Sequence, residues 1–167
     1  MKTEKIFFTN KSGQQLVGRL EVPADSHPHN YVLFGRCFTC NKNLLALKNI
    51  SRALTARGFA VFRFDFTGLG ESEGDFADTN FSGNVEDLLA AGDHLAAHFE
   101  APSLLIGHSL GGAAVVFAAA QMDSVKAVAT IAAPADPEHV THLLQNSIEE
   151  IEASGQAIVN LSGRDFT

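Results

Sequence analysis

The chain has 167 residues, of which 46% are hydrophobic and 19% charged, and its formal net charge is −7 at pH 7. This length suits one domain with a hydrophobic core, and the composition excludes an intrinsically disordered chain. The acidic balance, without any Lys/Arg cluster longer than a pair, argues against nucleic acid or an anionic membrane surface as a partner. No signal-peptide or membrane-span pattern is present, so we expect a cytoplasmic protein.

The first part of the chain predicts three strands, a helix and a fourth strand. Lys5–Thr9 and Gln15–Val22 flank the turn sequence NKSGQ and predict an antiparallel hairpin. Tyr31–Gly35 is a short apolar run typical of a buried strand, Asn43–Arg57 has the apolar spacing of a helix, and Phe59–Phe64 predicts the next strand.

The alternation continues after a glycine-rich loop. The predicted elements are a helix opening near Ser82–Asn84, a strand at Ser103–Ile106, a helix at Gly111–Met122, a strand at Val125–Ala132, a helix at Asp136–Ala153 and a strand at Gln156–Leu161. Strands that alternate with helices indicate crossover units and a doubly wound, mostly parallel sheet. We therefore expect an α/β fold with an antiparallel N-terminal hairpin.

The strongest chemical signal is Gly107-His108-Ser109-Leu110-Gly111, between an apolar strand and an alanine-rich helix. A serine on such a sharp turn takes strained backbone angles, and small residues two positions away on each side avoid clashes. The turn lifts the hydroxyl above the sheet and aims free amides at a developing oxyanion. Ser109 is therefore the candidate nucleophile.

An oxyanion hole requires a second backbone amide, from the loop that follows the third strand. By position, the amides of Phe38 and Leu110 are the best pair of donors. The alternative interpretation of the whole motif is a tight turn with an incidental serine.

Together, the segments RFDFTGLGESEGDF, NVEDL, LIGHSLGGAA, AVATIAAPADPEHV and FTCNKN resemble the α/β-hydrolase superfamily. They are most similar to the bacterial group whose hydrolase domain is often fused to an OsmC-like peroxidase domain, and the likeness runs from Tyr31 to Phe166. The resemblance implies an eight-stranded, mostly parallel sheet and hydrolysis of an ester or related acyl bond of a small molecule by Ser109. We expect no cofactor and no metal ion.

The chain departs from that superfamily in two ways. Many members have a histidine where this chain has Arg36, which puts the geometry of the oxyanion loop and the choice of substrate in question. Members carry the acid and the histidine base after later strands, so we expect both to lie beyond residue 167. On this interpretation residues 1–167 are the N-terminal part of a hydrolase domain, lack its last strands, include a cap-like segment at 134–167 and have weak or no esterase activity alone.

Some residues within the chain remain alternative candidates for the acid and the base. His139 and His142 follow the sixth strand and could act as base, although each is more often a surface histidine. Asp136 could supply the acid, but it also suits the N-cap of the next helix.

Two other functions stay open. Cys37 and Cys40, spaced C-x-x-C, could support a thiol-dependent redox role, although free cysteines also pack as small apolar groups. A chain without its base could instead be a non-catalytic binding module. If its last sheet edge is unpaired, that edge invites pairing with a second copy, so we expect a homo-oligomer.

Overall fold

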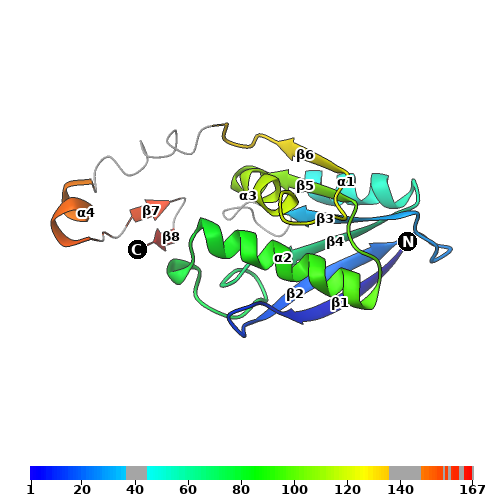
Figure 1. The fold of residues 1–167 in the computed structure, drawn as a ribbon, viewed down its shortest axis with the longest axis horizontal. Coiled ribbons are helices and arrows are strands. Elements are labelled where there is room, and N and C mark those ends of the chain that lie inside the picture. Colours follow the sequence, from blue (N-terminus) through cyan, green and yellow to red (C-terminus); the bar gives the residue numbers. More distant parts are fainter. Residues whose placement is uncertain (37–44, 136–147, 156, 158, 162–163, 167) are drawn as a thin grey trace.

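The computed structural model describes residues 1–36, 45–135, 148–155, 157, 159–161 and 164–166. In this part of the chain the main sheet has six strands in the order β1-β2-β4-β3-β5-β6 (Figure 1). They are β1 (Lys2–Thr9), β2 (Gln15–Val22), β3 (Asn30–Gly35), β4 (Phe59–Asp65), β5 (Leu104–His108) and β6 (Ala127–Ile131). β2 pairs antiparallel with β1 and β4, whereas β4, β3, β5 and β6 run parallel. This mixed sheet with an antiparallel N-terminal hairpin confirms the predicted fold class.

Three helices cover the two faces of the sheet (Figure 1). α1 (Leu45–Thr55) lies against β4 and β2 on one face, and α2 (Phe81–His98) and α3 (Leu110–Ala119) pack together on the other. α2 begins after Asn80, whose side-chain oxygen accepts a hydrogen bond from the Gly83 amide at 2.9 Å. No described helix is long and apolar enough to cross a membrane.

The central strand β3 is buried on both faces, as its apolar sequence predicts. Tyr31 and Leu33 join the core under α2 and α3, whereas Val32 and Phe34 join a smaller core under α1. This alternation follows from the two-residue period of a strand. The two cores hold β3 between layers of helix, and β3 therefore gives the site a rigid base.

The face of the sheet that carries α1 becomes polar toward β2. Arg19 and Glu21 of β2 and Arg63 and Asp65 of β4 line a cavity of about 400 Å³ together with Arg36, which follows β3. Two partly buried ion pairs cross this cavity, Arg63 with Glu21 and Arg36 with Asp65.

The last predicted strand does not join the main sheet. Its described part, β7 (Val159–Leu161), pairs antiparallel with β8 (Arg164–Phe166) in a separate two-stranded sheet. β8 lies beside the short helix η1 (Phe76–Asp78). Of the helix expected over Asp136–Ala153, the described part is α4 (Ile148–Ser154), and 136–147 lie outside the described residues. The cap-like role of 134–167 stays a prediction.

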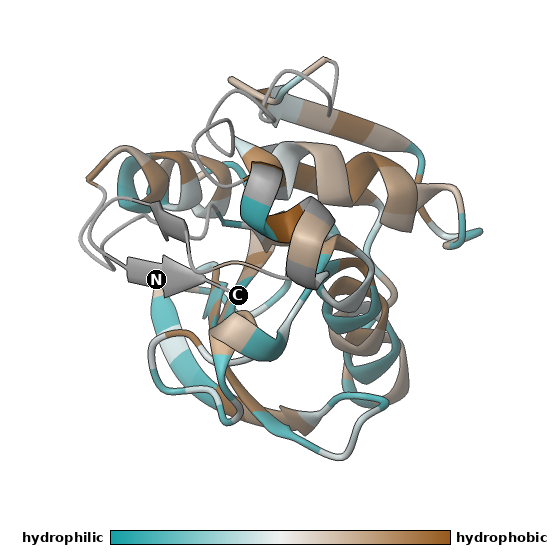
Figure 2. Ribbon diagram, turned by 90° about the vertical axis from the view of Figure 1, so that its left-hand side faces the viewer, coloured by the Kyte–Doolittle hydropathy of each residue, from teal (hydrophilic) through white to brown (hydrophobic). Residues whose placement is uncertain are grey.

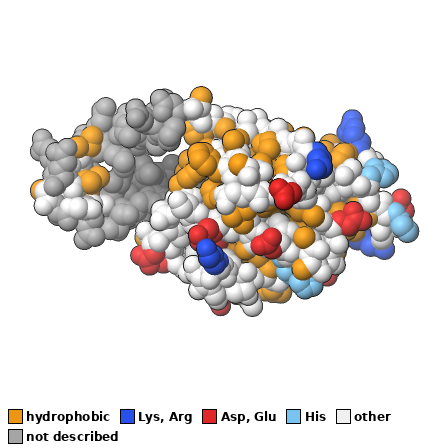
Figure 3. All heavy atoms as spheres, viewed as in Figure 1, with side chains coloured by type: hydrophobic (Ala, Val, Ile, Leu, Met, Phe, Trp, Pro, Cys, Tyr) orange, Lys and Arg blue, Asp and Glu red, His pale blue; other side chains and the backbone are white. Residues whose placement is uncertain are grey.

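β6 forms one edge of the main sheet among the described strands. All five of its residues are exposed, although four of them are apolar, and Figure 2 colours much of the strand as hydrophobic. In Figure 3 hydrophobic side chains gather over the region of α3 and β6. The exposed members include Val116, Phe117 and Val128.

Candidate active site

Ser109 lies in the sharp turn between β5 and α3, where the sequence predicts it. Its φ of 56° and ψ of −130° fall in a region that non-glycine residues rarely occupy. The Ser109 amide donates a hydrogen bond to the Ile131 carbonyl at the end of β6, at 2.9 Å. The turn is therefore tied to the neighbouring strand, which helps to hold the strained backbone in place.

The two glycines of the motif are required by close packing of the backbone. A Cβ on Gly107 would lie 2.4 Å from the carbonyl oxygen of Gly111, and a Cβ on Gly111 would lie 2.3 Å from that of Arg36. A side chain at either position would force the strand, the turn and the helix apart. The spacing G-x-S-x-G thus follows from the tight turn.

α3 begins directly after Ser109. The Ser109 carbonyl accepts the first bond of the helix, from the Gly112 amide at 2.7 Å. The amides of the first turn of a helix have no partner within it, and the aligned peptide dipoles favour negative charge there. Leu110 is the first residue of α3, so its amide is well placed as the predicted oxyanion donor. The second predicted donor, Phe38, lies outside the described residues.

Arg36 and Asp65 form a partly buried ion pair next to this turn. Their side chains are 16% and 15% exposed. Burial, together with the nearby Arg63 guanidinium, lowers the pKa of Arg36 to about 10, so the guanidinium is still charged at neutral pH. Asp65 also accepts a hydrogen bond from the Glu71 amide at 3.2 Å, which agrees with a structural role for this carboxylate.

The predicted acid and bases cannot be placed. Asp136, His139 and His142 lie outside the described residues, as do Cys37 and Cys40. The described range that contains β6 ends at Ala135. Near its end, Ala133 packs against the first turn of α3, where a Cβ on Gly112 would lie 2.7 Å from the Ala133 Cβ. The chain thus leaves β6 alongside the turn that carries Ser109.

Two histidine pairs have positions away from this turn. His27 and His29 precede β3, at the opposite end of that strand from Arg36. His94 and His98 lie in the second half of α2, where their rings stack at 4.3 Å between centroids. Burial, and next the neighbouring His98, lowers the pKa of His94 below its ordinary value of 6.5.

Asp87 is a buried carboxylate that the sequence pattern did not single out. Asp87 of α2 is 1% exposed and accepts hydrogen bonds from Asn10, at 2.9 Å, and from both the amide and the hydroxyl of Thr67, at 2.9 and 3.1 Å. Asp87 therefore connects α2 to the turn between β1 and β2 and also to the loop that follows β4. A signal was present, since Asp87 sits within the apolar face of its helix, between Val85 and Leu88.

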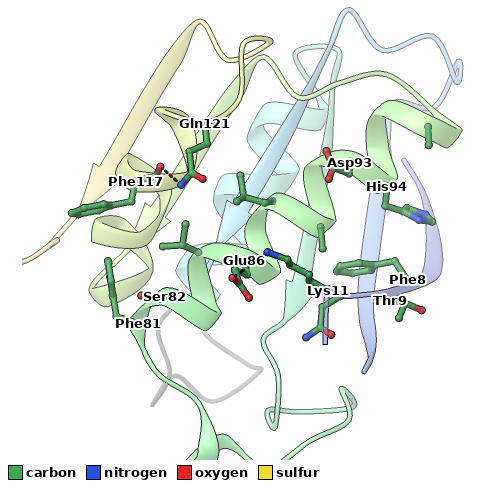
Figure 4. A pocket seen from close by; sticks show the side chains of 15 residues that line it. Phe8, Thr9, Lys11, Phe81, Ser82, Glu86, Asp93, His94, Phe117 and Gln121 are labelled. Atoms are coloured by element: carbon green, nitrogen blue, oxygen red, sulfur yellow. Dashed lines mark hydrogen bonds and ion pairs between the residues drawn. The ribbon is translucent and has the colours of Figure 1, made fainter. Parts of the chain in front are cut away.

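A groove of about 840 Å³ lies over the outer side of α2 (Figure 4). It is lined by apolar residues such as Phe81 and Phe117 and by the charged residues Lys11, Glu86 and Asp93. Neither Ser109 nor its neighbours in the turn line it. No group of three or more His, Cys, Asp or Glu among the described residues is arranged to hold a metal ion.

Residues 40–158 match the hydrolase family described as "Serine aminopeptidase, S33". The chain belongs to this family. It is also similar to the esterase domain of a Rhodothermus marinus protein, with 51% identity and a TM-score of 0.75 over 99% of this chain and 64% of that one. Est1E from Butyrivibrio proteoclasticus, a structure with bound ferulic acid, shares the fold at 21% identity and a TM-score of 0.76, over 97% of this chain and 67% of that one.

Among curated proteins, the chain is 32% identical over 106 residues to the mitochondrial palmitoyl-protein thioesterase ABHD10 of Mus musculus. The match covers 63% of this chain but only 35% of the mouse protein. The chain thus spans about a third of the length of the curated relatives that it matches. These neighbours identify the fold of this S33 family member as the α/β-hydrolase fold.

Proposed function

We propose that the protein is a serine hydrolase that cleaves an ester or thioester bond of an acyl substrate. The observation that carries this proposal is the backbone conformation of Ser109. This residue has a positive φ and lies between β5 and the start of α3. Strain of this kind costs about 1–3 kcal/mol and persists at functional sites. Membership of a hydrolase family and similarity to an esterase domain and a thioesterase support the same chemistry.

The reaction begins when the Ser109 Oγ attacks the substrate carbonyl carbon. The new bond forms as the carbonyl electron pair moves onto oxygen, and the Leu110 amide donates to that oxyanion together with a second amide, which we assign to Phe38. A histidine takes the Oγ proton and passes it to the departing alcohol or thiol. The histidine then takes a proton from water, whose oxygen attacks the acyl carbon; the bond from that carbon to Oγ breaks, and the histidine returns the proton to Oγ.

The residues of this chain that we propose as base and acid lie outside the described residues. Within this chain the candidates are His139 or His142 for the base and Asp136 for the acid, and the remaining alternative is a pair supplied by another part of the natural polypeptide. Separate substitution of each histidine by glutamine distinguishes these cases. Loss of kcat in only one variant identifies the base, and full activity in both means that the base lies elsewhere.

The first test is hydrolysis by the complete natural polypeptide of three substrates that differ in the leaving group: p-nitrophenyl acetate, an acyl thioester and an aminoacyl p-nitroanilide. We expect turnover of one or both of the first two, and at least a thousandfold loss in Ser109→Ala. Ser82→Ala is the matched control, because Ser82 is an exposed serine near the start of α2. Cleavage of the anilide alone would identify a peptidase, and no turnover of any of the three would favour the non-catalytic binding module.

A further inference from the structure

Arg36 contacts the Ser109 turn through its backbone. Its carbonyl oxygen and carbon approach Gly111 so closely that a Cβ there would lie 2.3 and 2.8 Å from them. Gly111 in turn packs against Gly107, and these two glycines flank Ser109. A shift of the Arg36 backbone would therefore be transmitted to the turn by direct contact, because close-packed backbone cannot absorb it.

The side chain of Arg36 is held by Asp65. In the parallel pair β3 and β4, Phe34 lies opposite Arg63, so extending this register by two residues brings Arg36 opposite Asp65. The side chains then share the face of the sheet that carries α1, and their charged groups form the partly buried ion pair. Arg36 thus links the end of β4 to the first turn of α3.

Asp65 is itself fixed by the loop that follows it. Gly70, at a φ of 60°, packs so closely that a Cβ would lie 2.2 Å from the Asp65 carboxylate. The Glu71 amide donates to this carboxylate, and the Ser72 hydroxyl donates to the Asp65 carbonyl at 2.5 Å. The carboxylate therefore has one well-defined position, which in turn defines that of the guanidinium.

We propose that the Arg36–Asp65 ion pair positions the Ser109 turn, which makes Arg36 and Asp65 positioning residues for the hydrolysis. This inference rests on the function proposed above. The pair acts through the Arg36 carbonyl on Gly111, and neither side chain needs to touch the substrate. The guanidinium and the carboxylate are only 16% and 15% exposed, so each replaces part of the hydration that the other has lost.

The neighbouring pair Arg63–Glu21 provides a matched control. It is buried on the same face of the sheet, with side chains 12% and 8% exposed, but it joins the middle of β4 to β2. Loss of either pair leaves one buried charge without its partner, so both losses should lower stability. Only the loss of Arg36–Asp65 should also displace Ser109.

The test compares Asp65→Asn and Arg36→Gln with Glu21→Gln in the complete natural polypeptide, using p-nitrophenyl acetate below the melting temperature of each variant. We expect kcat to fall about 10- to 100-fold in the first two, with KM within about twofold of wild type, because a small misplacement of a reacting group has an effect of this size. In Glu21→Gln we expect a lower melting temperature but a kcat within about twofold of wild type. Arg36→Lys keeps the charge without the planar fork, so its kcat should fall about 3- to 10-fold.

A kcat in Asp65→Asn and Arg36→Gln equal to that of Glu21→Gln would overturn the inference, and so would an effect on KM alone. If these two variants do not fold, Arg36→Lys decides, because a wild-type kcat in that variant contradicts the positioning role. The Ser109→Ala variant distinguishes a failure of the proposed function from a failure of the positioning role. Hydrolysis that survives in Ser109→Ala rejects the proposed function, whereas loss in Ser109→Ala with wild-type kcat in the ion-pair variants rejects only the positioning role.

Discussion

At the scale of single residues, the Ser109 turn requires glycine at the flanking positions 107 and 111, because there is no room for a Cβ atom there. Gly107 packs against the Gly111 carbonyl and the Gly112 Cα, which a Cβ would approach to 2.4 and 2.5 Å. Both contacts are with backbone, so no side-chain rotation can relieve them. The motif could be predicted from the sequence for this reason, since its spacing is a direct consequence of local geometry.

Gly107→Ala should therefore destabilise the protein by about 1–3 kcal/mol, the usual cost of overpacking a filled site. Gly83→Ala is the matched control, because its nearest neighbour would lie at 3.7 Å and alanine favours the helical conformation. Urea unfolding of both variants measures the difference. Equal stability of the two would contradict the packing described for the turn.

His94 should make stability depend on pH. Its pKa is lowered in the folded protein, so between that pKa and 6.5 the unfolded chain binds more protons than the folded one. The contribution of neutral His94 is therefore complete above pH 6.5 and is lost as the pH falls below it. Thermal melts at pH 7.5 and 5.5 should show a smaller decrease for His94→Gln than for wild type, and an equal decrease would contradict this role of His94.

At the scale of elements, periodicity predicts where strands and helices lie but not which side chains meet between them. Apolar spacing predicts a strand at Tyr31–Gly35 and a helix that opens near Ser82–Asn84, and the structure has β3 and α2 at these places. It does not predict the Arg36–Asp65 pair, because that pair depends on β3 and β4 being neighbours in a particular register. The contacts of Asp87 could not be predicted for the same reason, since its partners Asn10 and Thr67 are distant in sequence.

Asp87→Asn should lower the free energy of unfolding by about 2 kcal/mol. An amide cannot accept bonds on both of its ends, so its NH₂ group would face a donor, from either Asn10 or Thr67, that is then left unsatisfied in the core. Asp93→Asn, on the exposed side of the same helix, should change stability by less than about 0.5 kcal/mol. A similar loss in both variants would mean that the effect is one of helix charge and not of the Asp87 network.

At the scale of the whole molecule, β6 is an apolar strand at the edge of the described sheet. The alternation of strands and helices predicts this strand. It also predicts the next strand in sequence, but not which strand that one pairs with. In the structure that strand, β7, forms a hairpin with β8, because strand pairing is decided by tertiary contacts and not by local pattern. The predicted Asp136, His139 and His142 also lie in the later part of the chain, outside the described residues.

We expect the 167-residue chain on its own to self-associate through β6, as edge strands with apolar side chains do. Val128, which is 40% exposed, is the residue to change. Val128→Lys should shift the chain toward monomer in sedimentation velocity, because a charge on an edge strand opposes pairing. A wild-type chain that is monomeric at high concentration would contradict this expectation.

In the proposed reaction Ser109 is the nucleophile, positioned by its turn and deprotonated by a histidine. The most direct measurement is the reaction of the complete natural polypeptide with a fluorophosphonate probe, followed by mass spectrometry of the labelled peptide. We expect covalent label on Ser109 alone, no label in Ser109→Ala and normal label in Ser82→Ala. Label on another residue, or an unchanged amount of label in Ser109→Ala, would contradict it.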